Sequence, residues 1–205
     1  IMPSLVGSEM CIRDRFTDIV QIGIGGSSLG PKCISYALKY LRKNTRKIHF
    51  LSNVDPDAVA SLLRQINPST TLFIAVSKSG TTSETVTNVH FISEHLKKHR
   101  LNPRDHLVSV TEKGTLMDDS EKYRHIFYIW DYIGGRYSVT SMVGAVIISC
   151  LVGEEIYLEV LKGAHSMDKI ALVEDLAKNL PLLSALLNIW NHNFPVSYTH
   201  LRAHE

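Results

Sequence analysis

Six consecutive residues could together bind a phosphate group. Residues 77–82 read Ser-Lys-Ser-Gly-Thr-Thr, which places four hydroxyls, one ammonium and one glycine in a short loop. The loop follows the apolar run 71–76 and precedes a helical pattern that begins near Thr82. Backbone N–H groups at a helix N-terminus point at a bound anion, and the helix dipole favours negative charge there. The alternative interpretation is an ordinary helix cap, for which one hydroxyl suffices.

Another loop of small residues, the first in chain order, follows the first apolar strand pattern, residues 18–24, so residues 77–82 form the second loop. Residues 25–31 read Gly-Gly-Ser-Ser-Leu-Gly-Pro, and a helical pattern continues from there, with Pro31 expected in the first turn of the helix. The turn is not a dinucleotide fingerprint, because Ser28 stands where the third glycine belongs and no acidic residue ends the next strand. It is not a Walker P-loop either, so it suits close approach by a small ligand, with Ser27 and Ser28 as donors.

The third loop, residues 131–138, contains paired glycines next to Arg136. It follows the aromatic run 125–130 and precedes an apolar helical pattern. Taken alone, it could equally be a tight turn with a surface arginine. Ligands in open α/β sheets lie beyond the carboxyl ends of the strands, so these three loops could converge on one pocket.

Strand and helix patterns alternate along the chain and predict an α/β fold. Asp55 is expected to cap the second helix, with Pro56 at its first position. The alternation predicts a parallel, doubly wound five-stranded sheet with helices on both faces. Strands are expected at 18–24, 47–52, 71–76, 106–110 and 125–130, and helices at 31–43, 56–66, 82–98 and 138–151. After Gly153 the pattern is helical up to Phe194.

The composition excludes several classes of protein. A net charge of +2 over 205 residues gives no indication of nucleic-acid binding. The 3 cysteines form neither a disulfide framework nor a metal-binding motif, which fits a reducing cytoplasm. No apolar run reaches the roughly 20 residues needed to span a bilayer.

The ordered set of motifs resembles the glucose-6-phosphate isomerase (phosphoglucose isomerase) family. The resemblance lies in residues 22–27, 77–85 and 134–138, and extends from about Phe16 to Phe194. It implies a sugar-isomerase (SIS) domain with a flavodoxin-like sheet. It also implies a cytoplasmic homodimer of glycolysis and gluconeogenesis that converts glucose 6-phosphate and fructose 6-phosphate through a cis-enediolate, without a metal or redox cofactor.

The resemblance also implies a role for each matching residue. Arg136 would stabilise the enediolate by an electrostatic interaction of the oxyanion-hole kind. The groups that would contact the sugar phosphate are Gly26, Ser27, Ser77, Lys78, Ser79, Gly80, Thr81 and Thr82. Ser79 and Gly80 depart from the Thr-Phe of many members, but Ser79 keeps a hydroxyl.

The general base and the ring-opening groups of the family lie beyond the region that this chain matches. Loss of a general base alone lowers a rate by about 10²–10⁴-fold, so we expect the chain by itself to be inactive. Two other functions would use parts of the same pattern. A non-catalytic sugar-phosphate-binding module would need residues 77–82 but not Arg136, and a dehydrogenase domain is disfavoured by the incomplete glycine fingerprint.

Four segments are expected along the chain. Residues 16–152 would form the sugar-isomerase domain, and residues 153–194 a helical segment that leads to a second domain. Residues 1–15 and 195–205 have no periodic pattern and are interpreted as artefactual tails of an internal fragment.

Overall fold

The computed structural model describes residues 15–42 and 46–192. The described residues belong to two compact units, which divide between Tyr157 and Leu158. The first unit contains the sheet and the three loops. The expected tails lie outside the described residues, except for Arg15. No helix in the described part of the chain is long and apolar enough to cross a membrane.

The first unit is built on a parallel five-stranded sheet with the order β2-β1-β3-β4-β5. The strands are β1 (Asp18–Ile22), β2 (Lys47–Leu51), β3 (Thr71–Val76), β4 (Leu107–Thr111) and β5 (His125–Tyr128). The strand order reverses between β1 and β3, where Ile22 pairs with Ala75. Such a reversal opens a crevice at the carboxyl ends of the strands, and the loops after β1 and β3 both begin there. The predicted sheet is therefore confirmed.

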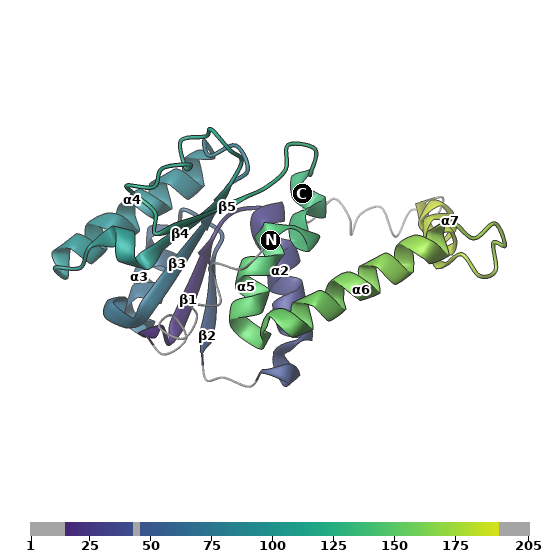
Figure 1. Ribbon diagram of the computed structural model, residues 1–205, viewed down its shortest axis with the longest axis horizontal. Coiled ribbons are helices and arrows are strands. Elements are labelled where there is room, and N and C mark those ends of the chain that lie inside the picture. The colour runs from purple at the N-terminus through teal and green to yellow at the C-terminus, as the bar shows by residue number, and fades with distance from the viewer. Residues whose placement is uncertain (1–14, 43–45, 193–205) are drawn as a thin grey trace. The chain divides into compact units, whose positions relative to one another are not determined.

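Helices cover both faces of the sheet, as the sequence predicts (Figure 1). Helices α3 (Pro56–Gln65) and α4 (Ser83–Lys98) lie on one face, while α2 (Gly26–Ala37) and α5 (Met142–Val152) lie on the other. Every residue of β1, β3 and β4 is buried. This explains why these strands are mainly apolar rather than apolar on one face only.

Side chains of the two central strands anchor the core on the α3 and α4 face. Phe73 of β3 is fully buried, and it clusters with Val20 of β1 and with Ile92 and Leu96 of α4. Burial of one such side chain contributes about 1.5–3 kcal/mol, so this face alone holds α4 firmly against the sheet. This packing also fixes the N-terminus of α4, which directly follows residues 77–82 in the chain.

Helix α2 begins earlier than the sequence predicts. It starts at Gly26 instead of residue 31 and ends at Ala37, so Pro31 lies at its sixth position and not in its first turn. Gly25 makes the early start possible, because it precedes the helix with a φ of 58°, a conformation that favours glycine. A proline in a helix interior removes one helical hydrogen bond, and here the carbonyl that loses its donor is that of Ser27.

The helix expected at 138–151 also begins differently. Residues Gly135–Thr140 form the 3-10 helix η4, and α5 follows only after Ser141. Ser141 caps α5, since its hydroxyl accepts a hydrogen bond of 3.3 Å from the N–H of Val143. The glycine pair therefore belongs to a short helical turn that carries Arg136.

The helical pattern after Gly153 corresponds to α6 (Glu154–Ala171), which continues into the second unit, and α7 (Leu180–His192). The buried Asn179 connects these helices. Its amide nitrogen donates to the carbonyls of Ala171 and Val173, and its side-chain oxygen accepts from the N–H of Leu182 at 2.9 Å. One amide thus caps the end of α6 and the start of α7.

The cap of α3 gives a direct test of the fold. Asp55 Oδ1 accepts from the N–H of Asp57 at 2.9 Å, and Pro56 occupies the first helical position, as predicted. We expect Asp55→Ala to lower the free energy of unfolding by about 1 kcal/mol, because the N–H of Asp57 loses its partner. Urea unfolding followed by circular dichroism measures the change. Asp57→Asn keeps that hydrogen bond and is the control; an equal loss in both variants would contradict the capping role.

Candidate functional site

The loops after β1 and β5 are in close backbone contact. A Cβ atom on Gly26 would lie 2.1 Å from the carbonyl oxygen of Gly135 and 2.8 Å from the backbone nitrogen of Arg136. Only glycine fits at position 26 for this reason. The buried Ser138 hydroxyl strengthens the contact, since it lies 2.6 Å from the Gly135 carbonyl oxygen and 3.4 Å from that of Gly26.

The loop after β3 is joined to the same cluster. The Lys78 ammonium donates a hydrogen bond to the carbonyl of Asp131, at the start of the third loop. The first and second loops leave neighbouring strands, and a Cβ on Gly23 would lie 3.0 Å from the carbonyl oxygen of Val76. The structure therefore brings the three predicted loops together at the carboxyl ends of the strands. In this arrangement the Lys78 ammonium already has a partner in the protein.

Within residues 77–82, the hydroxyls bind one another. Ser77 Oγ lies 2.9 Å from Thr82 Oγ1, and Thr81 Oγ1 donates to Ser79 Oγ at 3.0 Å. Ser77 is buried, whereas Ser79 and Thr81 are exposed. Thr82 is the N-cap residue of α4, but its hydroxyl makes no capping hydrogen bond. The alternative interpretation as an ordinary helix cap would need a capping hydrogen bond from a side chain, and the N-cap position of α4 makes none.

Gly80 gives residues 77–82 their shape. Its φ is 65°, and an added Cβ would lie 2.6 Å from Thr115 Cβ. Asp118 holds the segment around Thr115 by accepting hydrogen bonds from the N–H of Gly114 at 2.8 Å and from the Tyr128 hydroxyl at 2.9 Å. These bonds lower the pKa of Asp118, and the second raises the pKa of Tyr128. The ionised carboxylate of Asp118 thus holds the segment against which Gly80 packs.

Two further residues support the site, and no feature of the sequence pattern indicates either role. Tyr157 of α6 lies in the first unit, and its hydroxyl donates to the carbonyl of Ser141 at 3.1 Å. Burial raises the pKa of Tyr157 to about 12, so the hydroxyl keeps its proton. The second is Asp131, which acts through its backbone carbonyl, a group that every residue type carries.

Arg136 and Glu84 differ in their surroundings. Arg136 is exposed on η4, with its backbone held by Gly26 and its guanidinium at the surface. Glu84 lies in the first turn of α4, where its own backbone N–H and then the Ser83 hydroxyl, at 2.9 Å, lower the pKa of its carboxyl. A carboxylate at this end of α4 is stabilised by the helix dipole.

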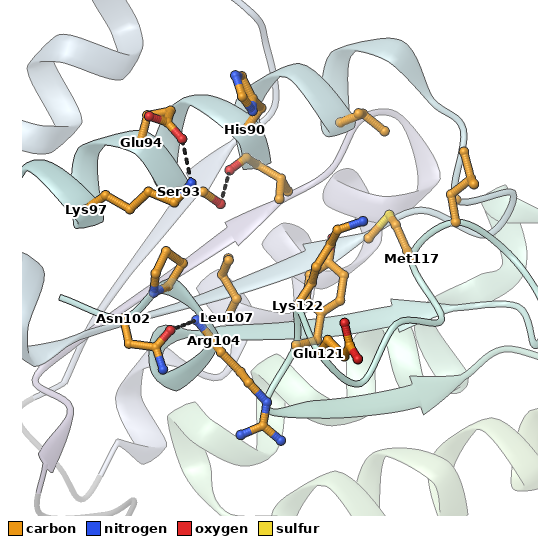
Figure 2. Close-up of a pocket in the computed structure, with 16 residues that line it drawn as sticks. His90, Ser93, Glu94, Lys97, Asn102, Arg104, Leu107, Met117, Glu121 and Lys122 are labelled. Atoms are coloured by element: carbon orange, nitrogen blue, oxygen red, sulfur yellow. Dashed lines mark hydrogen bonds and ion pairs between the residues drawn. The ribbon is translucent and has the colours of Figure 1, made fainter.

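A cavity of about 510 Å³ lies between α4 and the segment that follows it (Figure 2). It is lined by His90, Glu94 and Lys97 of α4 and by Asn102 and Lys122 of the following segment. Of the residues predicted to bind phosphate, only Gly80 lines this cavity. The predicted binding residues therefore lie mainly in the three loops at the strand ends, and not around this cavity. Among the described residues, no group of three or more His, Cys, Asp or Glu side chains is placed to hold a metal ion.

The fold and its loops define a sugar-isomerase-type α/β domain. The sequence matches the family Phosphoglucose isomerase over residues 10–203. It is 52% identical to a glucose-6-phosphate isomerase of Chlamydia abortus over 182 residues, which is 89% of this chain and 34% of the relative. It is 53% identical to that of Protochlamydia amoebophila over 181 residues, or 88% of this chain and 34% of the relative.

A solved structure agrees with these sequence matches. The crystal structure of a glucose-6-phosphate isomerase from Chlamydia trachomatis superposes with a TM-score of 0.87 at 43% identity, covering 91% of this chain and 36% of that one. The chain belongs to the phosphoglucose isomerase family. It spans about a third of the length of the curated relatives that it matches.

The contact between the first and third loops can be tested with two glycines. We expect Gly26→Ala to lower the free energy of unfolding by about 1–3 kcal/mol, because the new methyl group overlaps the Gly135 carbonyl. Gly135→Ala is the matched control, since nothing lies within 4 Å of its added Cβ. Urea unfolding compares the two variants. If Gly26→Ala is as stable as Gly135→Ala, the loops are not packed as described.

Proposed function

We propose that this chain supplies the sugar-phosphate-binding part of an isomerase that interconverts glucose 6-phosphate and fructose 6-phosphate. The observation that carries the proposal is the joining of three loops at the strand ends: Gly26 against Gly135, and Lys78 on Asp131. Membership of the phosphoglucose isomerase family supports it. The sugar phosphate would bind in the crevice between these loops.

The phosphate group would bind at the N-terminus of α4. Ser77 and Thr82 already hold their hydroxyls 2.9 Å apart, so little ordering would be needed when an anion arrives. Ser79 and Thr81 are exposed and could donate from the other side of the loop. Lys78 would exchange its hydrogen bond with Asp131 for one with the phosphate, or share it between the two. Gly26 and Ser27 would contact the same ligand from the first loop.

Arg136 would act on the reacting end of the sugar. A guanidinium beside C1 and C2 would stabilise the negative charge that develops on the oxygens of a cis-enediolate. Phosphate binding would position those carbons, because interactions far from the reacting bonds can be used to orient them. The general base and the ring-opening groups would come from parts of the family's homodimer that this chain does not match, so binding without turnover is expected of the chain itself.

Ligand titration tests the proposal. Isothermal titration calorimetry should detect binding of fructose 6-phosphate and weaker binding of fructose, with no binding of NAD. Absence of any preference for the phosphorylated sugar would overturn the proposed function. Tight binding of NAD would favour a dinucleotide domain instead.

The loop assignment predicts a selective loss. We expect Ser77→Ala with Thr82→Val to weaken binding of fructose 6-phosphate by about 10–100-fold, because two donors to a charged group are removed. Binding of fructose should change much less. Ser61→Ala with Thr87→Val makes the same chemical changes away from the loops and is the control. An equal loss for both ligands would sink the assignment of residues 77–82 to the phosphate.

The role of Arg136 can be separated from phosphate binding with a charged analogue. A phosphorylated sugar acid carries a carboxylate where the enediolate would develop its charge. We expect Arg136→Gln to weaken binding of this acid by at least about tenfold and that of fructose 6-phosphate by less than about threefold. Arg64→Gln, at an exposed position of α3, is the control. An equal effect on both ligands would favour a module that binds sugar phosphates without catalysing their isomerisation.

A further inference from the structure

A glutamine side chain lies fully buried near the end of β1, an inner strand of the sheet. Gln21 is on β1 between β2 and β3, paired with Phe50 and Ile74, and its exposed fraction is 0%. Burial of an amide costs free energy unless its polar atoms find partners. An apolar side chain would fill this position without that cost, so the amide calls for a specific explanation.

Gln21 makes one hydrogen bond through its side-chain nitrogen. Nε2 donates to the backbone carbonyl of Ser27 at 2.5 Å, whereas the buried Oε1 atom has no hydrogen-bond partner among the described residues. The role of this amide therefore depends on the contact with Ser27. Ser27 also packs against Gly23, the residue directly after β1, since a Cβ there would lie 3.0 Å from Ser27 Cβ and 3.1 Å from its carbonyl oxygen.

The Ser27 carbonyl needs a donor because of Pro31. In an α-helix, the carbonyl of residue 27 accepts from the N–H of residue 31. Residue 31 is a proline inside α2, so this N–H does not exist. The Gln21 amide donates to the carbonyl in its place. A glutamine on the strand and a proline in the helix are thus two parts of one arrangement.

We propose that Gln21 is a positioning residue for the sugar-phosphate site, and that it acts by replacing the N–H that Pro31 lacks. The hydrogen bond would fix the first turn of α2, and with it Gly26 and Ser27, to the end of β1. This inference rests on the proposed function, because Gly26 and Ser27 are positioned for a ligand only if the first loop binds one. A helix closed by its own N–H would hold the same turn without any tie to the sheet.

The test is a double-mutant cycle between Gln21 and Pro31. Gln21→Met keeps the length of the side chain and removes the donor, while Pro31→Ala restores the helical N–H. With Pro31 present, we expect Gln21→Met to weaken binding of fructose 6-phosphate by about tenfold at a temperature where circular dichroism shows every variant folded. In the Pro31→Ala background, the same substitution should change binding by less than about twofold. Gln65→Met, on the surface of α3, is the control.

Amide hydrogen exchange provides a readout that needs no ligand. The N–H groups of Ser28 and Leu29 bond to the Gly25 carbonyl at 3.0 and 2.9 Å and report on the first turn of α2. We expect Gln21→Met to speed their exchange by about tenfold when Pro31 is present and to leave it unchanged in the Pro31→Ala background.

The two readouts separate the positioning role from the proposed function. Unchanged exchange and binding in Gln21→Met would overturn the positioning role, and so would equal losses with Pro31 and in the Pro31→Ala background. If exchange follows the cycle but the unsubstituted chain binds no sugar phosphate, the proposed function fails and, with it, the claim that the turn is held for a ligand.

Discussion

The arrangement of the loops depends on the close approach of two glycine backbones. Gly26 follows β1 and Gly135 follows β5, and the sheet order places β3 and β4 between these strands. The third loop therefore has to reach back over the strand ends to meet the first. It can do so because Gly26 carries no side chain; a methyl group there would lie 2.1 Å from the Gly135 carbonyl oxygen. Ser138 then holds the two backbones together with one hydroxyl.

Much of the fold was predictable because the inner strands β1, β3 and β4 are buried on both faces. Such strands are mainly apolar, and they can be recognised without knowledge of their partners. The run 71–76 matches β3 at both ends. Turn chemistry added the cap of α3, since Asp55 followed by Pro56 is a local signal whose meaning does not depend on the rest of the chain.

The sequence predicts three loops that converge at the strand ends, but not the contacts that join them. Hydroxyls, glycines and charges after strands are visible in the sequence, whereas the bond from Lys78 to the Asp131 carbonyl is not, because a backbone acceptor leaves no trace in residue type. The start of α2 was missed for a related reason. Pro31 was placed in a first turn because prolines are common there. Pro31 instead lies at the sixth position of α2. There the Gln21 side chain of β1 donates to the Ser27 carbonyl, which lacks its usual helical donor.

The contacts that join the loops suggest how such a site could distinguish an isomerase from a module that only binds sugar phosphates. Phosphate is the part of the proposed substrate that does not react, so a phosphate bound by residues 77–82 would not by itself specify the chemistry. Specificity for isomerisation would require a fixed distance between the phosphate and the group that stabilises the developing charge. In this fold that distance depends on backbone contacts: β3 leads directly into residues 77–82, and Gly26 packs against the backbone of Gly135 and Arg136. Because backbone contacts are stiffer than contacts between long side chains, they are suited to hold an exposed arginine at a set position above the sheet.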